Sequence, residues 1–408
     1  MGWQTQLLAN WTEQTALITP ELDAEGRVKL TEEVEHAILS LFPFLRSPPK
    51  PDDRTPLATL RDQQIPGSRG IVISTGKGQF RYACHLIRNL RDVLGSSLPI
   101  EIAYAGEDDL PVEHRNGLKS LGDNIDTVDV LTVFSDDTLK LREVGWSIKP
   151  FALLASKFEE AILMDADAVF LQRPEILLDE HSGYGSTGAL LFHDRLLWQN
   201  VFKDRAKWWR EQMKGHMPSP ALLQSKVWME GYAEEEDSGV IVLNKSSVRT
   251  VLGILHICWQ NTKEVRDAWT YKLTYGDKES WWFGLELSGV PYAFEEHYGA
   301  VLGEPRHENK EQKVCGFSIA HLGEHQRLLW FNGSLLKNKA VNLTEYWTPT
   351  HWMVDAEWRK GATKPDMSCM IGDSPQEVPP EAIDVIKRSI EKAHELDKQF
   401  ATLIGPLD

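Results

Sequence analysis

The sequence is poor in cysteine and has no long apolar run, and each shortage excludes a class of protein. The 408 residues include four cysteines, Cys84, Cys258, Cys315 and Cys369, which form no CxxC pair, so we expect no zinc site. Four cysteines are also too few for a disulfide scaffold in a chain of this length, and they leave the redox compartment open. No stretch approaches the roughly 20 apolar residues of a membrane span, and the start of the chain lacks the basic region and apolar core of a signal peptide. We therefore expect a soluble globular chain with no membrane segment.

Basic charge is also scarce. The 44 Lys and Arg against 60 Asp and Glu give a net charge of −16, which excludes the electrostatic footprint of a nucleic-acid binder. Hydrophobic residues at 42% and charged residues at 25% are close to the globular average, so wholesale disorder is excluded. The length predicts one large domain with extensions, or two domains. It leaves the oligomeric state open.

Tryptophan, by contrast, is abundant. The 15 Trp outnumber the 9 Tyr and the 14 Phe, and the indole ring suits both core packing and stacking on sugar rings. Sequons at Asn10, Asn244, Asn332 and Asn342 are weakly indicative of a secretory route. Both features favour a link to carbohydrate.

The first 66 residues form a predicted N-terminal helical extension and Pro-rich linker. Thr31 is placed to cap a helix whose apolar stripe runs from Val34 to Leu41. The segment 47–56 contains four prolines and is predicted to be the linker, because proline interrupts helices and central strands.

From residue 67 the pattern changes to alternating strands and helices. Short β-branched or apolar runs predict strands, and runs with helical spacing predict helices between them. The predicted strands are 70–75, 99–104, 127–131 and 161–164, and the predicted helices lie near 82–94, with Gly95 as a stop, and near 151–158. This order predicts an α/β fold with a mostly parallel central sheet and helices on both faces, in which ligands bind beyond the carboxyl ends of the strands.

The catalytic domain is predicted to end at residue 345. Residues 346–408 then form a C-terminal extension that ends in one amphipathic helix, since apolar residues recur at three-four spacing from Ile383 to Leu403 after Pro379-Pro380. We expect this helix to pack back on the domain.

The sharpest chemical feature is Asp165-Ala166-Asp167, directly after the predicted buried strand 161–164. Side chains two apart on an extended chain point the same way, so both carboxylates can serve one hard divalent cation. A turn in which the aspartates bond nearby backbone N–H groups is the plainer alternative.

Two enzyme chemistries use such a pair. In haloacid-dehalogenase-type phosphatases the first Asp is a nucleophile, with Gly276-Asp277 as a possible later acidic motif, but there the pair follows the first strand of the core. In nucleotide-sugar transferases of the GT-A type the DxD pair follows a nucleotide-binding half, as it does here. A non-catalytic carbohydrate-binding protein is disfavoured, because buried paired carboxylates are costly without a cation.

Several motifs recur in the order known from one family. The chain resembles the fungal Golgi α-mannosyltransferases of glycosyltransferase family 71 over about residues 68–340. The motifs that carry the resemblance are Gly70-Ile71-Val72-Ile73, Thr75-Gly76-Lys77-Gly78, Leu98-Pro99-Ile100-Glu101, Lys149, Ser156-Lys157-Phe158-Glu159-Glu160, Leu163-Met164-Asp165-Ala166-Asp167, Phe192-His193-Asp194-Arg195, Asp237-Ser238-Gly239 and Gly276-Asp277-Lys278-Glu279.

The resemblance implies a retaining enzyme of the GT-A fold that moves mannose from GDP-mannose to a hydroxyl of a mannose-containing glycan. A UDP-sugar donor stays an alternative. The cofactor implied is Mn²⁺ or Mg²⁺, held by Asp165 and Asp167, with His321 similar in placement to the late metal-binding histidine of related enzymes. The implied location is the Golgi lumen if the chain is a truncated type II membrane protein. Otherwise the chain would be a soluble relative.

Further site residues follow from chemistry together with the resemblance. The candidates for holding the donor are Thr75, Gly76, Lys77, Lys149, Asp165, Ala166, Trp330, Asn332 and Gly333, of which the last three belong to a predicted closing loop. The carboxylates expected near the transferred sugar are Asp237, Glu236 and Asp277. The leaving phosphate can take the acceptor proton on the same face, and a double displacement through Asp237 or Glu236 is the alternative.

Overall fold

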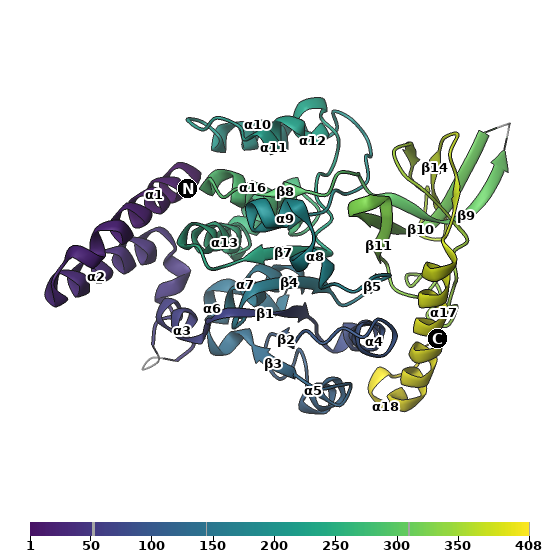
Figure 1. The fold of residues 1–408 in the computed structure, drawn as a ribbon, viewed down its shortest axis with the longest axis horizontal. Helices are drawn as coiled ribbons and strands as arrows, with labels where there is room; N and C mark the ends of the chain where they lie inside the picture. The colour runs from purple at the N-terminus through teal and green to yellow at the C-terminus, as the bar shows by residue number, and fades with distance from the viewer. Residues whose placement is uncertain (51–53, 144, 309–310, 408) are drawn as a thin grey trace.

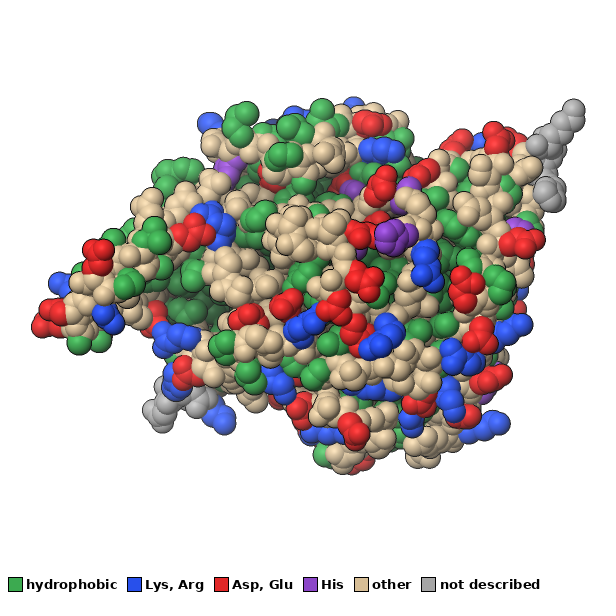
Figure 2. Space-filling view, viewed as in Figure 1, with side chains coloured by type: hydrophobic (Ala, Val, Ile, Leu, Met, Phe, Trp, Pro, Cys, Tyr) green, Lys and Arg blue, Asp and Glu red, His purple; other side chains and the backbone are tan. Residues whose placement is uncertain are grey.

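The computed structural model describes residues 1–50, 54–143, 145–308 and 311–407. Figure 1 shows a central α/β body, with helices α1 and α2 extending from one side and a second sheet with helix α17 on the other. On the face seen in Figure 2, acidic and basic side chains are interspersed rather than gathered by sign. Among the described helices none is both long and apolar enough to cross a bilayer.

The central sheet has seven strands in the order β3-β2-β1-β4-β7-β6-β8. Their bounds are β1 Ile65–Ser74, β2 Ile100–Tyr104, β3 Ile125–Asp129, β4 Phe158–Asp165, β6 Ala189–Leu191, β7 Val240–Asn244 and β8 Ala293–Phe294. β1 pairs in parallel with β2 and β4, and β2 pairs in parallel with β3. β7 runs antiparallel to both β4 and β6, while β6 and β8 are parallel. The predicted α/β class with a mostly parallel sheet is confirmed.

Both faces of the sheet are buried, which explains the continuous apolar runs of its strands. Along β1, Ile71 and Ile73 enter one core cluster and Val72 enters another. β4 divides in the same way, with Ile162 and Met164 on the first side and Leu163 on the second. Alternating side chains on a strand point to opposite faces, so helices must cover both.

The helices that cover the sheet come mainly from the connections between strands. Their bounds are α4 Phe80–Arg88, α5 Val112–Lys119, α6 Asp136–Leu139, α7 Ile148–Ala155, α8 Ile176–Asp179, α9 Ser182–Thr187, α10 Lys203–Gln212, α11 Pro220–Gln224, α12 Lys226–Glu230, α13 Val248–Gln260, α14 Lys263–Val265, α15 Tyr271–Leu273 and α16 Lys278–Ser288. α4 continues as a π-helical turn over Asn89–Val93, and Gly95 follows with a φ of 70°, so the predicted stop is confirmed.

A second sheet starts directly after the DxD pair. β5 (Ala168–Phe170) pairs with β11 (Arg327–Asn332), which pairs with β10 (Glu311–Gly323). The remaining strands are β9 Ala300–Glu308, β12 His351–Met353, β13 Glu357–Arg359, β14 Ser368–Ile371 and β15 Gln376–Glu377. Since β12 pairs with β9, and β14 with β10, the segment after residue 345 completes the same sheet. The predicted boundary at 345 therefore lies between two strands of one sheet.

The N-terminal extension is helical, but one cap is corrected. Its helices are α1 Gly2–Ile18, α2 Ala24–Leu41 and α3 Pro56–Gln63. The carboxylate of Asp23 accepts a hydrogen bond from the N–H of Gly26 at 2.8 Å and caps α2, so the prediction that Thr31 begins this helix is wrong. Thr31 lies inside α2, where its hydroxyl donates to the carbonyl of Arg27. In the predicted linker, residues 51–53 lie outside the described residues.

The extension and the tail both pack on the central body. α1 contacts α13 and α16. At the other end the C-terminal helix is α17 (Pro380–Gln399), followed by α18 (Ala401–Ile404), and α17 packs on α4 as predicted. Arg81 of α4 donates to Asp397 of α17 at 2.9 and 2.5 Å, and the ring of His85 lies 2.9 Å from the same carboxylate. This bidentate pair fixes the tail against α4, the helix that follows β1.

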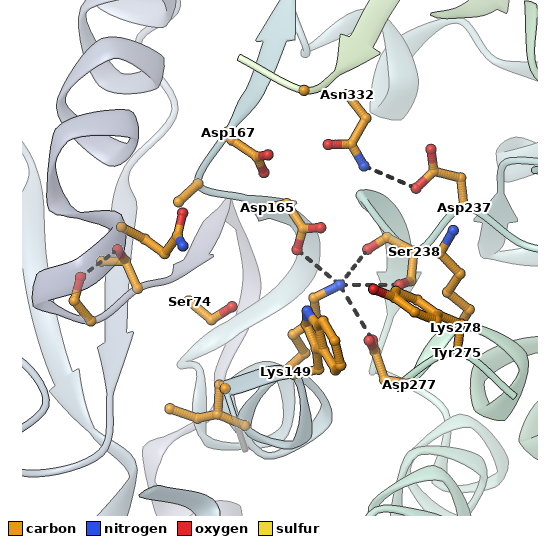
Figure 3. Close-up of a pocket in the computed structure, with 18 of the residues that line it drawn as sticks. Ser74, Lys149, Asp165, Asp167, Asp237, Ser238, Tyr275, Asp277, Lys278 and Asn332 are labelled. Carbon is orange, nitrogen blue, oxygen red and sulfur yellow. Dashed lines mark hydrogen bonds and ion pairs between the residues drawn. The ribbon is translucent and has the colours of Figure 1, made fainter. Parts of the chain in front are cut away.

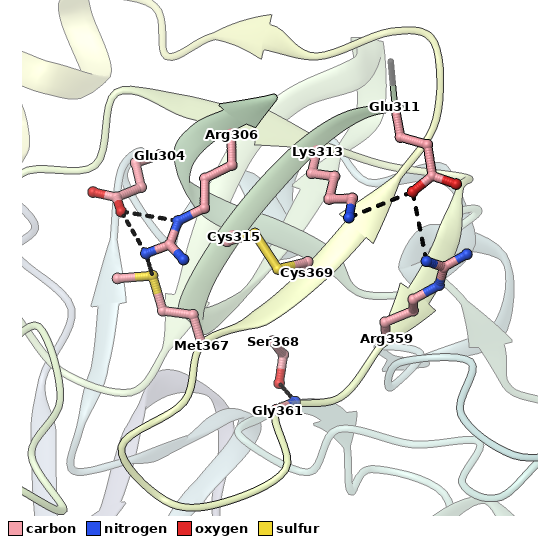
Figure 4. Close-up of a disulfide and its surroundings, with 10 residues drawn as sticks. All are labelled: Glu304, Arg306, Glu311, Lys313, Cys315, Arg359, Gly361, Met367, Ser368 and Cys369. Atoms are coloured by element: carbon pink, nitrogen blue, oxygen red, sulfur yellow. Dashed lines mark hydrogen bonds and ion pairs between the residues drawn. A yellow bond between two sulfur atoms is a disulfide. The ribbon is translucent and has the colours of Figure 1, made fainter. Parts of the chain in front are cut away.

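A disulfide joins Cys315 of β10 to Cys369 of β14 (Figure 4). The two residues face each other in the antiparallel register of these strands. Cys84 and Cys258 are buried and free. The bond links two residues that are 54 positions apart in the sequence, and it connects the middle of the second sheet to the segment after residue 345.

Replacing both bridged cysteines, Cys315→Ser with Cys369→Ser, should lower the free energy of unfolding by about 4 kcal/mol, because the bond removes loop-closure entropy from the unfolded chain. Urea denaturation under oxidising conditions measures this difference. Dithiothreitol should destabilise the wild type and leave the double variant unchanged. A wild type insensitive to reductant would contradict the role of the bond.

Candidate active site

A cavity of about 570 Å³ opens at the carboxyl ends of β1 and β4 (Figure 3). Its wall includes the end of each strand, Ser74 and Asp165, together with the loop that follows β4. The charged lining residues are Asp109, Arg142, Lys149, Asp165, Asp167, Arg195, Asp237, Asp277, Lys278 and Lys339. Ligands in sheets of this kind bind at this edge, as the sequence predicts.

Lys149 is the centre of the site. Its ammonium lies 2.8 Å from Oδ1 of Asp165 and 3.3 Å from Oδ2 of Asp277, and it donates to the carbonyl of Ser238 at 2.9 Å. The hydroxyl of Ser238 also lies 3.1 Å away. Lys149 is contributed by α7, Asp165 by β4, Ser238 by the start of β7 and Asp277 by the start of α16 (Figure 3). One buried cation therefore joins four elements that are far apart in the sequence.

At this cluster, burial and the neighbouring charges shift the pKa values of the side chains in opposite directions. Burial lowers the pKa of Lys149, but the carboxylates of Asp165 and Asp277 outweigh it and raise that pKa above its ordinary value. For Asp165, burial raises the pKa, and Lys149 offsets this only in part. The ammonium stays charged and keeps the two carboxylates close together.

Asp237 is held by a second set of bonds. Its Oδ1 accepts from the side-chain amide of Asn332 at 3.1 Å, and its Oδ2 lies 3.1 Å from Nε2 of His321. Burial raises the pKa of Asp237, but the hydrogen bonds and charges of His321, Lys278 and Asn332 outweigh it, so the pKa lies below its usual range. The carboxylate is therefore ionised where it faces the cavity.

Two lysines of the wall form ion pairs, one with a lining carboxylate and one with a carboxylate behind the wall. Lys339 contacts Asp167, and Lys278 contacts Asp194. Burial lowers the pKa of Lys278, but Asp194 and Asp237 outweigh it and raise that pKa above its ordinary value. Asp167 also accepts the N–H of Ser334 on its backbone carbonyl at 2.8 Å. This bond ties the DxD turn to the loop after β11.

Local packing explains two glycines of the site. A Cβ on Gly76 would lie 2.2 Å from a carboxylate oxygen of Asp109, so only glycine brings the end of β1 this close to that loop. A Cβ on Gly239 would lie 2.9 Å from the amide of Asn332. Both positions let the backbone approach the cavity closely.

Most predicted site residues lie on this wall. The lining includes the predicted residues Thr75, Gly76, Lys149, Asp165, Ala166, Asp167, Asp237, Asp277, Asn332 and Gly333. The other predicted residues, Lys77, Glu236, Trp330 and His321, do not line the cavity. Lys77 is exposed and lies between the lining residues Gly76 and Gln79.

Glu236 is buried on the opposite side of its strand from Asp237. Its Oε2 accepts the backbone N–H of Trp282 at 3.1 Å, while its Oε1 has no hydrogen-bond partner among the described residues. Burial and the neighbouring Glu279 raise the pKa of Glu236 well above its ordinary value. A neutral carboxyl with one oxygen unpartnered among the described residues fits this packing, and Glu236 lies behind the cavity wall rather than on it.

His321, a predicted metal ligand, lies directly behind Asp237, with its Nε2 3.1 Å from Oδ2 of that residue. Its ring stacks on Trp330 with centroids 4.1 Å apart and is almost fully buried. Within the described ranges, no three carboxylate, imidazole or thiolate groups are arranged to hold a metal ion. His321 and Trp330 form the packed layer behind Asp237, and the role of His321 as a metal ligand stays a prediction.

Some lining residues carry no signal in the sequence. Lys278 is part of the Gly276-Asp277-Lys278-Glu279 motif, so its place beside Asp277 could have been anticipated. Lys339, Arg142, Trp146 and Tyr275 come from loops with no recognisable pattern, and only the tertiary structure brings them to the wall.

Replacing Lys149 with Met should lower the free energy of unfolding by about 3–5 kcal/mol, because the carboxylates of Asp165 and Asp277 lose their buried counter-charge. Urea denaturation checks this value. Lys77→Met, at an exposed position, is the matched control and should stay within about 0.5 kcal/mol of the wild type. Adding Asp277→Asn to Lys149→Met should recover part of the loss, and a Lys149→Met variant as stable as the wild type would contradict the account.

Replacing Glu236 with Gln should change how stability depends on pH. The folded protein keeps the Glu236 proton, whereas the unfolded chain loses it near the ordinary pKa of 4.5, so the wild type should lose stability as the pH rises from about 4.5 towards 8. Glu236→Gln cannot ionise, and its stability relative to the wild type should increase over that range. Urea denaturation at pH 4.5, 6 and 8 measures both curves. Parallel curves would refute a neutral Glu236.

Residues 68–323 match a family model described as "Mannosyltransferase putative". "Putative alpha-1,3-mannosyltransferase MNN14" of Candida albicans is 28% identical over 304 residues, which cover 65% of this chain and 42% of that protein. "Alpha-1,3-mannosyltransferase MNT3" of Saccharomyces cerevisiae is 29% identical over 224 residues, 48% of this chain and 34% of that protein. The chain thus spans less than half the length of these relatives.

Solved structures show weaker similarity. The mannosyltransferase Ktr4p from Saccharomyces cerevisiae, in complex with GDP, has a TM-score of 0.37 at 11% identity and covers 64% of this chain and 83% of that chain. The galactosyltransferase LgtC, in complex with donor and acceptor sugar analogues, has a TM-score of 0.36 at 15% identity and covers 55% and 73%. The matched region contains the whole central sheet and the cavity wall as far as Ile319. The predicted GT-A type of fold is consistent with this family and this sheet.

Proposed function

The chain belongs to the mannosyltransferase family whose model it matches, and we propose that it transfers mannose from GDP-mannose to a hydroxyl of a mannose-containing glycan. The observation that carries the proposal is the pair Asp165 and Asp167 at the carboxyl end of β4, on the wall of a cavity built almost entirely from the matched residues. The α-1,3-mannosyltransferase names of the relatives support the sugar and the linkage class.

Different parts of the cavity wall carry different kinds of side chain, which suit different parts of a sugar nucleotide. Thr75 and Gly76 offer close-packed backbone at the end of β1, which suits a nucleoside. Lys278, Lys339 and Arg195 supply positive charge for a diphosphate. Asp237, Asp277 and Asn332 offer acceptors and a donor for the hydroxyls of the transferred sugar.

The donor set at Asp165 and Asp167 fits a hard divalent cation. Two carboxylates two residues apart, both on the cavity wall, provide oxygen ligands of the kind that Mn²⁺ and Mg²⁺ prefer. The diphosphate and water would complete the coordination without His321. When bound, such a cation supplies Lewis-acid stabilisation for the negative charge of the departing diphosphate.

Retention at the sugar carbon follows from α-linked donor and α-linked product. We favour attack by the acceptor hydroxyl on the face from which the diphosphate leaves, with a diphosphate oxygen taking the acceptor proton. For the alternative, a double displacement, Asp237 is the remaining nucleophile, because Glu236 does not line the cavity. Both oxygens of Asp237 already accept hydrogen bonds or contact His321, which lowers its suitability for attack.

A UDP-sugar donor remains the second candidate, since nothing on the cavity wall selects the base by itself. The phosphatase alternative loses its support, because Asp165 follows the fourth strand of the chain and its carboxylate is engaged by Lys149. From the resemblance to the fungal Golgi α-mannosyltransferases, we propose the Golgi lumen as the place of action.

Replacing Asp167 with Asn should lower the rate of mannose transfer by about 10²-fold or more, because one anionic ligand of the cation is lost. GDP release from GDP-mannose with Mn²⁺ and an α-mannoside acceptor measures the rate. Asp384→Asn, on the exposed side of α17, is the matched control and should retain full activity. A rate for Asp167→Asn within a few-fold of the wild type, with the fold intact by circular dichroism, would remove the cation site from the proposal.

Calorimetry should show tight binding of GDP with Mn²⁺ present and weak binding in EDTA. Lys149 and Lys339 already pair with Asp165 and Asp167, so a bound cation would supply the additional positive charge that the diphosphate needs, and the two affinities should differ by at least tenfold. If UDP binds more tightly than GDP, the donor assignment changes to a UDP-sugar, and the assignment of the chain as a glycosyltransferase stays. Equal GDP affinity with and without the metal would favour a metal-free transferase.

A further inference from the structure

Two exposed aromatic side chains meet at the rim of the cavity. The rings of Trp146 and Tyr275 lie with centroids 5.4 Å apart and planes tilted by 47°, and both line the cavity. Trp146 is 46% exposed and Tyr275 is 65% exposed. Together they present two adjacent apolar faces to solvent at the entrance of an otherwise charged site.

The pair is fixed relative to the reacting centre. Trp146 precedes Lys149 by three residues in the turn that leads into α7, and Tyr275 precedes Asp277 by two. Between Tyr275 and Asp277, Gly276 adopts a φ of 70°, and a Cβ there would lie 2.9 Å from the ring of Trp146. The backbone before α16 therefore packs directly on the indole, and the Lys149–Asp277 ion pair links the two supporting segments.

The position of the pair separates it from the nucleotide end. In Figure 3 the Tyr275 ring lies on the Asp277 side of the Lys149 ammonium, and Asp167 lies on the other side. Thr75, Gly76 and Asp109 line the part of the wall formed by the ends of β1 and the loop after β2, where nucleotides bind in such sheets. The aromatic pair comes from different segments, the turn before α7 and the loop before α16.

A pyranose presents an apolar C–H face and a ring of hydroxyls. Trp and Tyr stack on such a face and supply an N–H or O–H at the edge, and the contact area is gained at a small cost in side-chain entropy. We propose that Trp146 and Tyr275 form the platform for the acceptor sugar, with the accepting hydroxyl directed towards Lys149, Asp165 and Asp277. This inference rests on the proposed function, since it assigns the second substrate of the same reaction.

The test compares acceptor and donor kinetics in Trp146→Ala and Tyr275→Ala. With GDP-mannose, Mn²⁺ and α-1,2-mannobiose as the acceptor probe, each variant should raise the KM for mannobiose by about tenfold. In the slow hydrolysis of GDP-mannose without acceptor, the KM for GDP-mannose should stay unchanged in both variants. Water replaces the acceptor in this reaction and does not need the aromatic platform. Trp146→Phe and Tyr275→Phe should restore most of the acceptor affinity. An unchanged KM for the acceptor in both alanine variants would overturn the proposal. A rise in the KM for the donor alone would also overturn it, because it would assign the aromatic pair to the guanine base.

Trp269→Ala is the matched control, because Trp269 is 52% exposed and does not line this cavity. It should leave both KM values unchanged, and an effect as large as that of Trp146→Ala would overturn the assignment. Ligand-observed NMR of mannobiose gives a readout independent of turnover. Contact with the wild type and its loss in Trp146→Ala support the platform even if GDP-mannose is not the donor, whereas absence of contact with the wild type contradicts it.

Discussion

The buried ammonium of Lys149 is the interaction on which the site depends. Without it, the carboxylates of Asp165 and Asp277 would face each other with no counter-charge between them. With it, β4, β7, α7 and α16 are connected at one point, through Asp165, Ser238, Lys149 and Asp277. The same ion pair holds the supports of Trp146 and Tyr275. Under the proposed function, this one ion-pair cluster thus positions the residues assigned to the cation, the sugar and the acceptor together.

The second sheet adds a further constraint. β5 follows Asp167 immediately and pairs with β11, whose last residue is Asn332. Asn332 then bonds Asp237, and Ser334 bonds the carbonyl of Asp167. A shift of β11 would therefore change the DxD turn and the orientation of Asp237 at once. The disulfide and the strands after residue 345 stabilise this sheet from its far side, which gives the C-terminal segment a role in positioning the site.

Strong local signals in the sequence predicted the fold and the anchor of the site. Continuous β-branched runs predicted the parallel strands, and Asp165-Ala166-Asp167 at a strand end predicted the acidic wall. What the sequence left undecided depends on the tertiary structure. Asp23 and Thr31 are both acceptable helix caps by type, and the structure has Asp23 as the cap. His321 and Glu236 have the chemistry of ligands and nucleophiles, and the structure places both behind the cavity wall, where they contact Asp237 and Trp282. Trp146 and Tyr275 lie 129 positions apart and meet only in the folded chain.

The charge of the cavity wall accounts for entry of the donor under the proposed function. Five carboxylates and five cationic side chains line the described wall, so its formal charge is near zero; these are Asp109, Asp165, Asp167, Asp237 and Asp277 with Arg142, Lys149, Arg195, Lys278 and Lys339. A sugar diphosphate diester carries two negative charges, and one divalent cation balances them. The donor complex therefore enters without adding net charge. Because a diphosphate oxygen takes the acceptor proton in the proposed mechanism, the nucleoside diphosphate also carries two negative charges directly after transfer. The same balance that lets buried carboxylates exist at the site thus keeps the net charge of the site constant through the proposed reaction.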